Sequence, residues 1–141
     1  QLLLSRGAQV NAQDKSGLTP LMAASELGNT VAVILLIDKG ADVNLQDYDG
    51  LSPLILTAYT SQHDVARILI GHESQPELAD DQFTTPLMIA AQQGDMEMVK
   101  LLVEAGANPK TRKGPNGYRA ADIAKLNDHK EVAAYLKAAS E

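Results

Sequence analysis

Histidines and carboxylates are the side chains with which this cysteine-free sequence would bind a metal ion or move protons. The closest histidines are His63 and His72, nine residues apart in a segment with a helical pattern. Because a helix turns by about 100° per residue, side chains at that spacing lie on opposite faces and cannot hold one metal ion. We therefore expect no metal site.

Adjacent carboxylates at Asp80 and Asp81 raise the question of paired acid–base catalysis. Asp80, however, recurs as Asp14 and Asp47 at intervals of 33 residues, and Asp residues often hydrogen-bond the backbone of their own turn. The GPNG segment at 114–117 lacks the strand, lysine and spacing of a phosphate-binding loop. The residues therefore indicate a chain without a catalytic site or a bound cofactor.

The composition fits one ordered domain, with 141 residues and 45% apolar content. No apolar run reaches the roughly 18 residues that a membrane span needs. The chain begins without methionine, so we expect further sequence before residue 1 in the native protein.

Charge is distributed unevenly along the chain. Residues 1–99 hold 13 acidic and 4 basic residues, whereas residues 100–141 hold 5 acidic and 8 basic ones. This balance disfavours nucleic-acid binding, which needs a continuous basic face. It leaves two interpretations of the acidic part, a solvated surface or a surface that binds a basic partner.

The elements that would position these side chains repeat with a period of 33 residues. Three segments share one frame: DKSGLTPL (14–21), DYDGLSPL (47–54) and DDQFTTPL (80–87). A hydroxyl residue followed by proline predicts the N-cap and first residue of a short helix. Gly28 and Gly94 predict its end in left-handed geometry, where other copies have Ser61 and Asp128. A second helix follows, with apolar residues at helical spacing.

With GADVN at 40–44 and GANPK at 106–110, these motifs make the chain resemble the ankyrin-repeat family over essentially its whole length. The resemblance implies an all-α repeat solenoid of helix pairs with projecting β-hairpin loops. We expect one domain at 1–141, made of a partial repeat (1–13), full repeats (14–46, 47–79 and 80–112) and a C-terminal capping repeat (113–141). His129 matches a histidine of the family pattern, which implies a structural role.

The sequence departs from that pattern at several points. ESQPE at 73–77 stands where GADVN is expected. We place the weakest junction between the second and third full repeats, because Ser61 lacks the backbone freedom of glycine and Pro76 lacks an N–H group. Asn44 is similar to asparagines that hydroxylases modify in ankyrin repeats, and its alternative role is that of a buried loop residue that forms hydrogen bonds.

The resemblance also implies protein binding through a concave surface of hairpin tips and first helices. Matching positions one at a time gives the candidate partner-binding residues Tyr48, Asp49, Leu51, Tyr59, Asp81, Gln82, Phe83, Gln92, Gln93 and Tyr118. Aromatic residues make up only 4% of the chain, and Tyr and Phe are enriched in interface cores. Their concentration on one expected surface favours binding anchors; the alternative is packing against loops of their own stack.

We therefore predict a non-catalytic protein–protein interaction module without metal or cofactor, monomeric on its own. Two alternatives stay open: an inhibitor or immunity protein that blocks an enzyme with the same surface, and a structural scaffold. Acidic residues at Asp49 and Asp81 favour a partner protein with a basic surface. We expect a cytoplasmic location, and the lack of cysteine is equally compatible with a periplasmic or secreted one.

Phe83 stands where the two sister segments have Gly17 and Gly50. We expect it to adopt the left-handed conformation of those glycines, at a cost of about 1–2 kcal/mol. Burial of its ring under a partner would offset this cost by about 1.5–3 kcal/mol.

Overall fold

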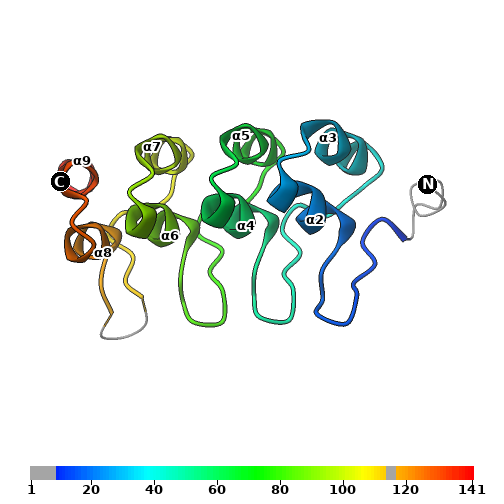
Figure 1. Ribbon diagram of the computed structural model, residues 1–141, viewed down its shortest axis with the longest axis horizontal. Helices are drawn as coiled ribbons and strands as arrows, with labels where there is room; N and C mark the ends of the chain where they lie inside the picture. The colour runs from blue at the N-terminus through cyan, green and yellow to red at the C-terminus, as the bar shows by residue number, and fades with distance from the viewer. Residues whose placement is uncertain (1–8, 114–116) are drawn as a thin grey trace.

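Four helix pairs stand side by side in one row in the computed structural model, which describes residues 9–113 and 117–141 (Figure 1). The helices are α2 (Pro20–Leu27), α3 (Thr30–Asp38), α4 (Pro53–Thr60), α5 (His63–Gly71), α6 (Pro86–Gln93), α7 (Met96–Glu104), α8 (Ala120–Leu126) and α9 (Lys130–Ala139). The first helices of the pairs (α2, α4, α6, α8) form one layer, and the second helices (α3, α5, α7, α9) form the other. The all-α repeat solenoid that the sequence predicts is confirmed.

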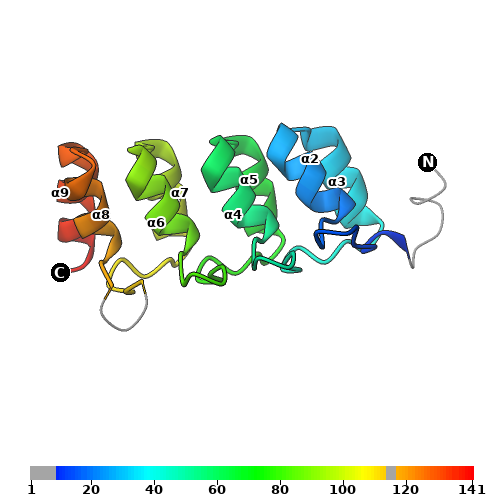
Figure 2. The same cartoon turned by 60° about the horizontal axis from the view of Figure 1, so that its bottom comes forward.

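Loops project to one side of the row, next to the layer of first helices (Figure 2). In the described ranges these hairpins contain no assigned strand. Each of the first three is closed by backbone hydrogen bonds of its aspartate; in the second, the Asp47 N–H donates to the Leu51 carbonyl at 2.9 Å and the Asp47 carbonyl accepts from the Gly50 N–H at 3.0 Å. The start of the expected partial repeat (residues 1–8) and part of the GPNG segment (114–116) lie outside the described residues.

Capped N-termini explain where the first helices begin. The N-cap hydroxyl accepts a hydrogen bond from the third helical N–H at 3.2–3.3 Å, in the pairs Thr19–Met22, Ser52–Ile55 and Thr85–Met88. Proline occupies the first helical position in all three. The last pair differs, because Arg119 provides no cap with its side chain and its N–H instead donates to the Asp122 carboxylate at 3.0 Å.

Left-handed residues end the first helices, as the sequence predicts. Gly28 and Gly94 have φ values of 72° and 70°, and Ser61 and Asp128 take the same conformation with φ values of 56° and 64°. Glu73 does so too, with φ 71°, in the place of Gly40. The ESQPE segment therefore keeps the left-handed turn of the glycine-containing loops, at the cost of a side chain in that conformation.

The core is a continuous apolar layer between successive pairs. It contains equivalent residues from each of the first three pairs, including Leu21, Leu54 and Leu87 from the first helices and Val33, Ala66 and Val99 from the second. In the last pair, Ala121 stands where the inner pairs have a buried leucine. Lys125, which is exposed, stands where they have a small buried residue. Each pair thus buries its apolar surface against its neighbours, and the C-terminal end is polar.

Side chains also bind neighbouring loops to each other along the row. The Gln46 amide donates to the Gly50 carbonyl at 2.7 Å and to the Ala79 carbonyl at 2.9 Å, and Gln13 makes the equivalent bonds one repeat earlier. The Asn44 amide oxygen accepts from the Gln75 N–H at 2.8 Å. Asn44, which is half-buried, thus forms hydrogen bonds with the next loop, in line with the alternative to modification.

Candidate protein-binding surface

Backbone hydrogen bonds join the first three hairpin tips into one row. The Tyr48 N–H donates to the Ser16 carbonyl at 3.0 Å, and one repeat later the Asp81 N–H donates to the Asp49 carbonyl at 3.1 Å. Neighbouring tips approach so closely that a Cβ on Gly50 would lie 2.6 Å from the Asp81 nitrogen. Glycine is required there for space as well as for its φ of 84°.

The recurring aspartates hold the tips in shape. The Oδ1 atom of Asp80 accepts from the N–H groups of Gln82 and Thr84 at 2.9 and 3.0 Å. Asp14 and Asp47 make the same pair of bonds in their own loops. The turn role expected for these carboxylates is confirmed, and the tips are rigid platforms for the side chains between them.

Four of the five aromatic side chains are exposed on the tips and first helices. Their exposed fractions are 66% for Tyr48, 46% for Tyr59, 61% for Phe83 and 57% for Tyr118. The fifth, Tyr135, is half-buried in α9, with the Lys100 ammonium 5.8 Å from its ring centre. The exposed rings are the largest apolar groups that a partner would meet on this side of the molecule.

Phe83 has the left-handed conformation expected from its alignment with glycine, with φ 61°. Its ring remains largely exposed, so packing within the stack does not compensate for the backbone strain. The residue is therefore costly to the folded chain in isolation.

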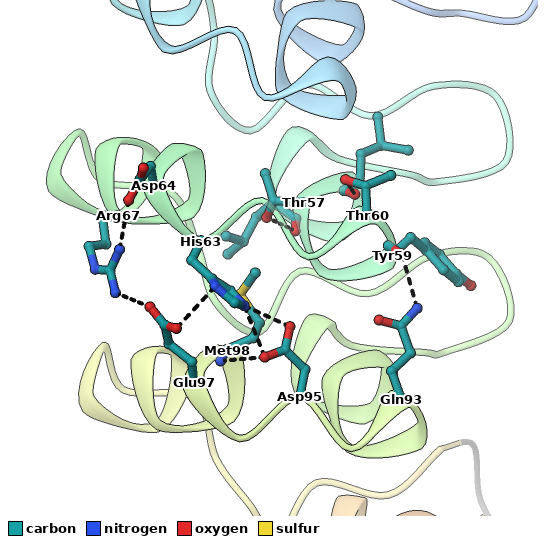
Figure 3. Close-up of polar contacts among 12 residues, drawn as sticks. Thr57, Tyr59, Thr60, His63, Asp64, Arg67, Gln93, Asp95, Glu97 and Met98 are labelled. Carbon is teal, nitrogen blue, oxygen red and sulfur yellow. Dashed lines mark hydrogen bonds and ion pairs between the residues drawn. The ribbon is translucent and has the colours of Figure 1, made fainter.

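Tyr59 of α4 is affected by its neighbours at both its phenol and its backbone carbonyl. Partial burial, and then the negative charge of Asp80, raise the pKa of the Tyr59 phenol above its ordinary value near 10. The backbone carbonyl of Tyr59 accepts from the Gln93 amide at 3.0 Å (Figure 3). Gln93, expected to contact a partner, thus also links α6 to α4.

The other expected site residues lie on the same hairpin tips and first helices. Asp49, Asp81, Gln82 and Gln92 are exposed, and Leu51 is half-buried. Asp81 and Asp49 belong to tips that are directly bonded to each other, whereas Tyr118 lies on the last pair, at the far end of the row. The structure therefore groups the candidates around the second and third tips, with Tyr118 separate from them.

Two further groups of apolar residues are exposed in addition to the named candidates, and the first of them falls at first-helix positions that the family resemblance already assigns to the expected binding surface. Leu27 and Leu126 lie at the ends of first helices, where Leu27 is equivalent to Thr60 and Gln93, and Leu126 is equivalent to Tyr59 and Gln92. A second group, Val31, Ile34 and Leu35, is exposed on α3. Comparison of the repeats could have revealed that group, because the residues equivalent to Val31 and Ile34 in α5 are the charged residues Asp64 and Arg67.

The histidines have contacts within the stack. His129 Nε2 lies 3.0 Å from the Gln92 carbonyl, which confirms the structural role expected for it. His63 lies between Asp95 and Glu97 of α7 (Figure 3). Within residues 9–113 and 117–141, no three His, Asp or Glu side chains are arranged to hold a metal ion. No helix in these ranges has the length and apolar character to cross a bilayer.

Stacked helix pairs with loops projecting to one side define a repeat protein. A family model described as ankyrin repeats (3 copies) matches residues 1–80 and 72–141. The chain belongs to the ankyrin-repeat family. Ankyrin repeats are general protein–protein interaction modules, and proteins built from them are typically non-catalytic. No curated protein matches this sequence.

Proposed function

We propose that this chain binds a partner protein through the surface formed by its second and third hairpin tips and the adjacent helices α4 and α6. The observation that supports this most strongly is the exposure of Tyr48, Tyr59 and Phe83 around these tips. Large aromatic groups are prominent among the residues that dominate the energetics of protein interfaces, and truncating one such anchor costs about 2 kcal/mol or more, which is about thirtyfold in affinity.

The backbone strain of Phe83 supports the same conclusion. A phenylalanine at φ 61° with an exposed ring destabilises the free protein. Burying that ring in a complex would give a favourable contribution of the same order as the strain. The residue is thus better suited to a bound state than to the free one.

Charge favours a partner with a basic surface. Asp49 and Asp81 lie on adjacent, bonded tips beside the aromatic rings, and neither forms an ion pair within the described part of the chain. Lysine or arginine side chains of the partner would complement these carboxylates and speed association. A binding rate that falls with added salt is expected from this arrangement.

Capture followed by hydrogen-exchange footprinting tests the proposal. The immobilised chain is used to isolate a partner, which is identified by mass spectrometry and purified. In the complex, amides of residues 47–51 and 80–84 and of α4 and α6 should gain protection, while those of the outer helix α3 should not. Protection restricted to α3, α5 and α7 would contradict the proposal. If the partner is an enzyme, its activity in the complex separates simple binding from inhibition.

A further inference from the structure

His63 occupies an unusual position between two carboxylates at the junction of the second and third helix pairs. Its Nε2 atom lies 2.8 and 2.9 Å from the two carboxylate oxygens of Asp95, and its Nδ1 atom lies 3.2 Å from Glu97 Oε1 (Figure 3). Arg67 continues the cluster, because its guanidinium pairs with Glu97 and, at 2.9 Å, with Asp64. All the ion pairs found among the described residues belong to this cluster.

The other junctions are bonded differently at the equivalent position. Gln62 and His129 each reach back to a carbonyl near the end of the preceding first helix, at Glu26 and Gln92. Asp95 occupies the same position in the third pair but has no hydrogen to donate. The matching carbonyl, that of Tyr59, is bonded by Gln93 instead, so the Asp95 carboxylate is available to His63.

The two ring nitrogens of His63 therefore both face an acceptor. A neutral imidazole carries one N–H and presents a lone pair at the other nitrogen, whereas an imidazolium donates from both. With a neutral ring, one of the two carboxylates faces a nitrogen lone pair. Only the protonated ring satisfies both contacts.

We propose that His63 is a proton-dependent clamp between the second and third helix pairs, closed when its imidazole is protonated. The groups facing it are Asp95 and Glu97 from α7, and Asp64 and Arg67 from its own helix. Helices α4 and α6 contain no charged residue, and the only one in α3 is Asp38 at its far end. Three carboxylates against the one guanidinium of Arg67 leave the cluster short of positive charge unless the ring is protonated.

The direction of the effect follows from the contacts. The additional attraction is present in the protonated form, so the junction is stabilised at acidic pH and the contribution is lost as the ring gives up its proton. Histidine is the side chain that changes charge between about pH 5 and pH 8. In a stack where each pair contacts only its neighbours, one junction can change without altering the others.

Thermal unfolding of the wild type and of His63→Gln at pH 5.5 and pH 8.0 tests the clamp. Glutamine keeps a polar side chain but cannot be protonated in this range. The Tm of the wild type minus the Tm of His63→Gln should be about 3 °C larger at pH 5.5 than at pH 8.0. A difference of this size is expected for one such contact in a chain of this length. The matched control is His129→Gln, whose difference from wild type should not change with pH, because His129 contacts a carbonyl.

Two further measurements keep the test decisive if His63→Gln folds poorly. Asp95→Asn, which retains an oxygen to cap α7 as Asn29 does for α3, should abolish the same pH-dependent gain. In the wild type, NMR signals of the His63 ring nitrogens and of the Met98 amide, which bonds to Asp95, should titrate with one common midpoint. The clamp would be overturned if the Tm difference between the wild type and His63→Gln were constant with pH or grew towards pH 8.0. Different titration midpoints for the His63 ring and the Met98 amide would also overturn it.

Discussion

Phe83 and Gly50 occupy the same place in successive loops, and they should respond to substitution in opposite directions. Phe83→Gly removes about 1–2 kcal/mol of left-handed strain and adds about 0.5–1 kcal/mol of unfolded-chain entropy. We therefore expect unchanged or slightly higher stability. Gly50→Ala should destabilise by about 2 kcal/mol, because its φ is 84° and the added Cβ would collide with the Asp81 backbone. Urea unfolding measures both changes, and a clear loss of stability in Phe83→Gly would assign the ring a packing role.

Tyr59 provides a second test at the scale of the residue. Burial, and then Asp80, raise the pKa of its phenol, so the folded state holds this proton more tightly than the unfolded state. The associated stability is present below about pH 10 and is lost as pH rises through the folded-state pKa. Asp80→Asn, which keeps the oxygen that bonds Gln82 and Thr84, should lower the Tyr59 pKa part of the way. Carbon-13 NMR of the phenol ring measures it, and an unchanged pKa in the variant would exclude a contribution from Asp80.

At the scale of the element, the caps of the first helices are the features to test. Thr85→Ala removes the acceptor of the Met88 N–H and should cost about 1 kcal/mol. In α8, the Arg119 side chain provides no such cap. The other half of the capping box is present, because the Asp122 carboxylate accepts a hydrogen bond from the Arg119 N–H. Arg119→Thr completes the capping box and should stabilise the chain by up to about 1 kcal/mol. Circular dichroism melts compare the two variants; equal effects of the same sign would show that capping does not control these helices.

The elements themselves were largely predictable from the sequence, because their causes are local. Three of these local causes recur in the repeats: a hydroxyl residue before proline, a glycine after eight helical residues, and an aspartate four residues before the end of a turn. Each acts through hydrogen bonds within its own segment. The contacts between His63 and Asp95 and between Gln93 and Tyr59 join residues in different pairs. They depend on how one pair is placed against the next, which the 33-residue period does not specify. The exposed apolar residues of α3 required comparison of equivalent positions between repeats.

At the scale of the whole molecule, strain is concentrated between the second and third helix pairs. Three of the four described non-glycine residues with positive φ lie between α4 and α6: Ser61 inside the second pair, and Glu73 and Phe83 between the second and third pairs. Because stability in a stack is a sum of nearest-neighbour terms, we expect α2–α5 and α6–α9 to open as two blocks. Native-state hydrogen exchange should give each block its own free energy of opening.

Glycine substitutions provide the corresponding check. In Ser61→Gly combined with Glu73→Gly, relief of left-handed strain should stabilise the junction by up to about 1 kcal/mol per site. The two blocks should then exchange with more similar free energies. A wild-type chain that opens as one unit, or that divides at another junction, would contradict this account.

We propose above that the surface around the second and third tips binds a partner protein. The most direct measurement is the affinity of the captured partner for the wild type, for Tyr59→Ala combined with Phe83→Ala, and for Val31→Ala combined with Ile34→Ala as a control on α3. The control removes exposed apolar side chains from a different face. We predict that the aromatic double variant loses at least about thirtyfold in affinity while it keeps the wild-type circular dichroism spectrum, and that the control binds as the wild type does. Unchanged affinity of the folded aromatic variant, or a larger loss in the control, would contradict the claim.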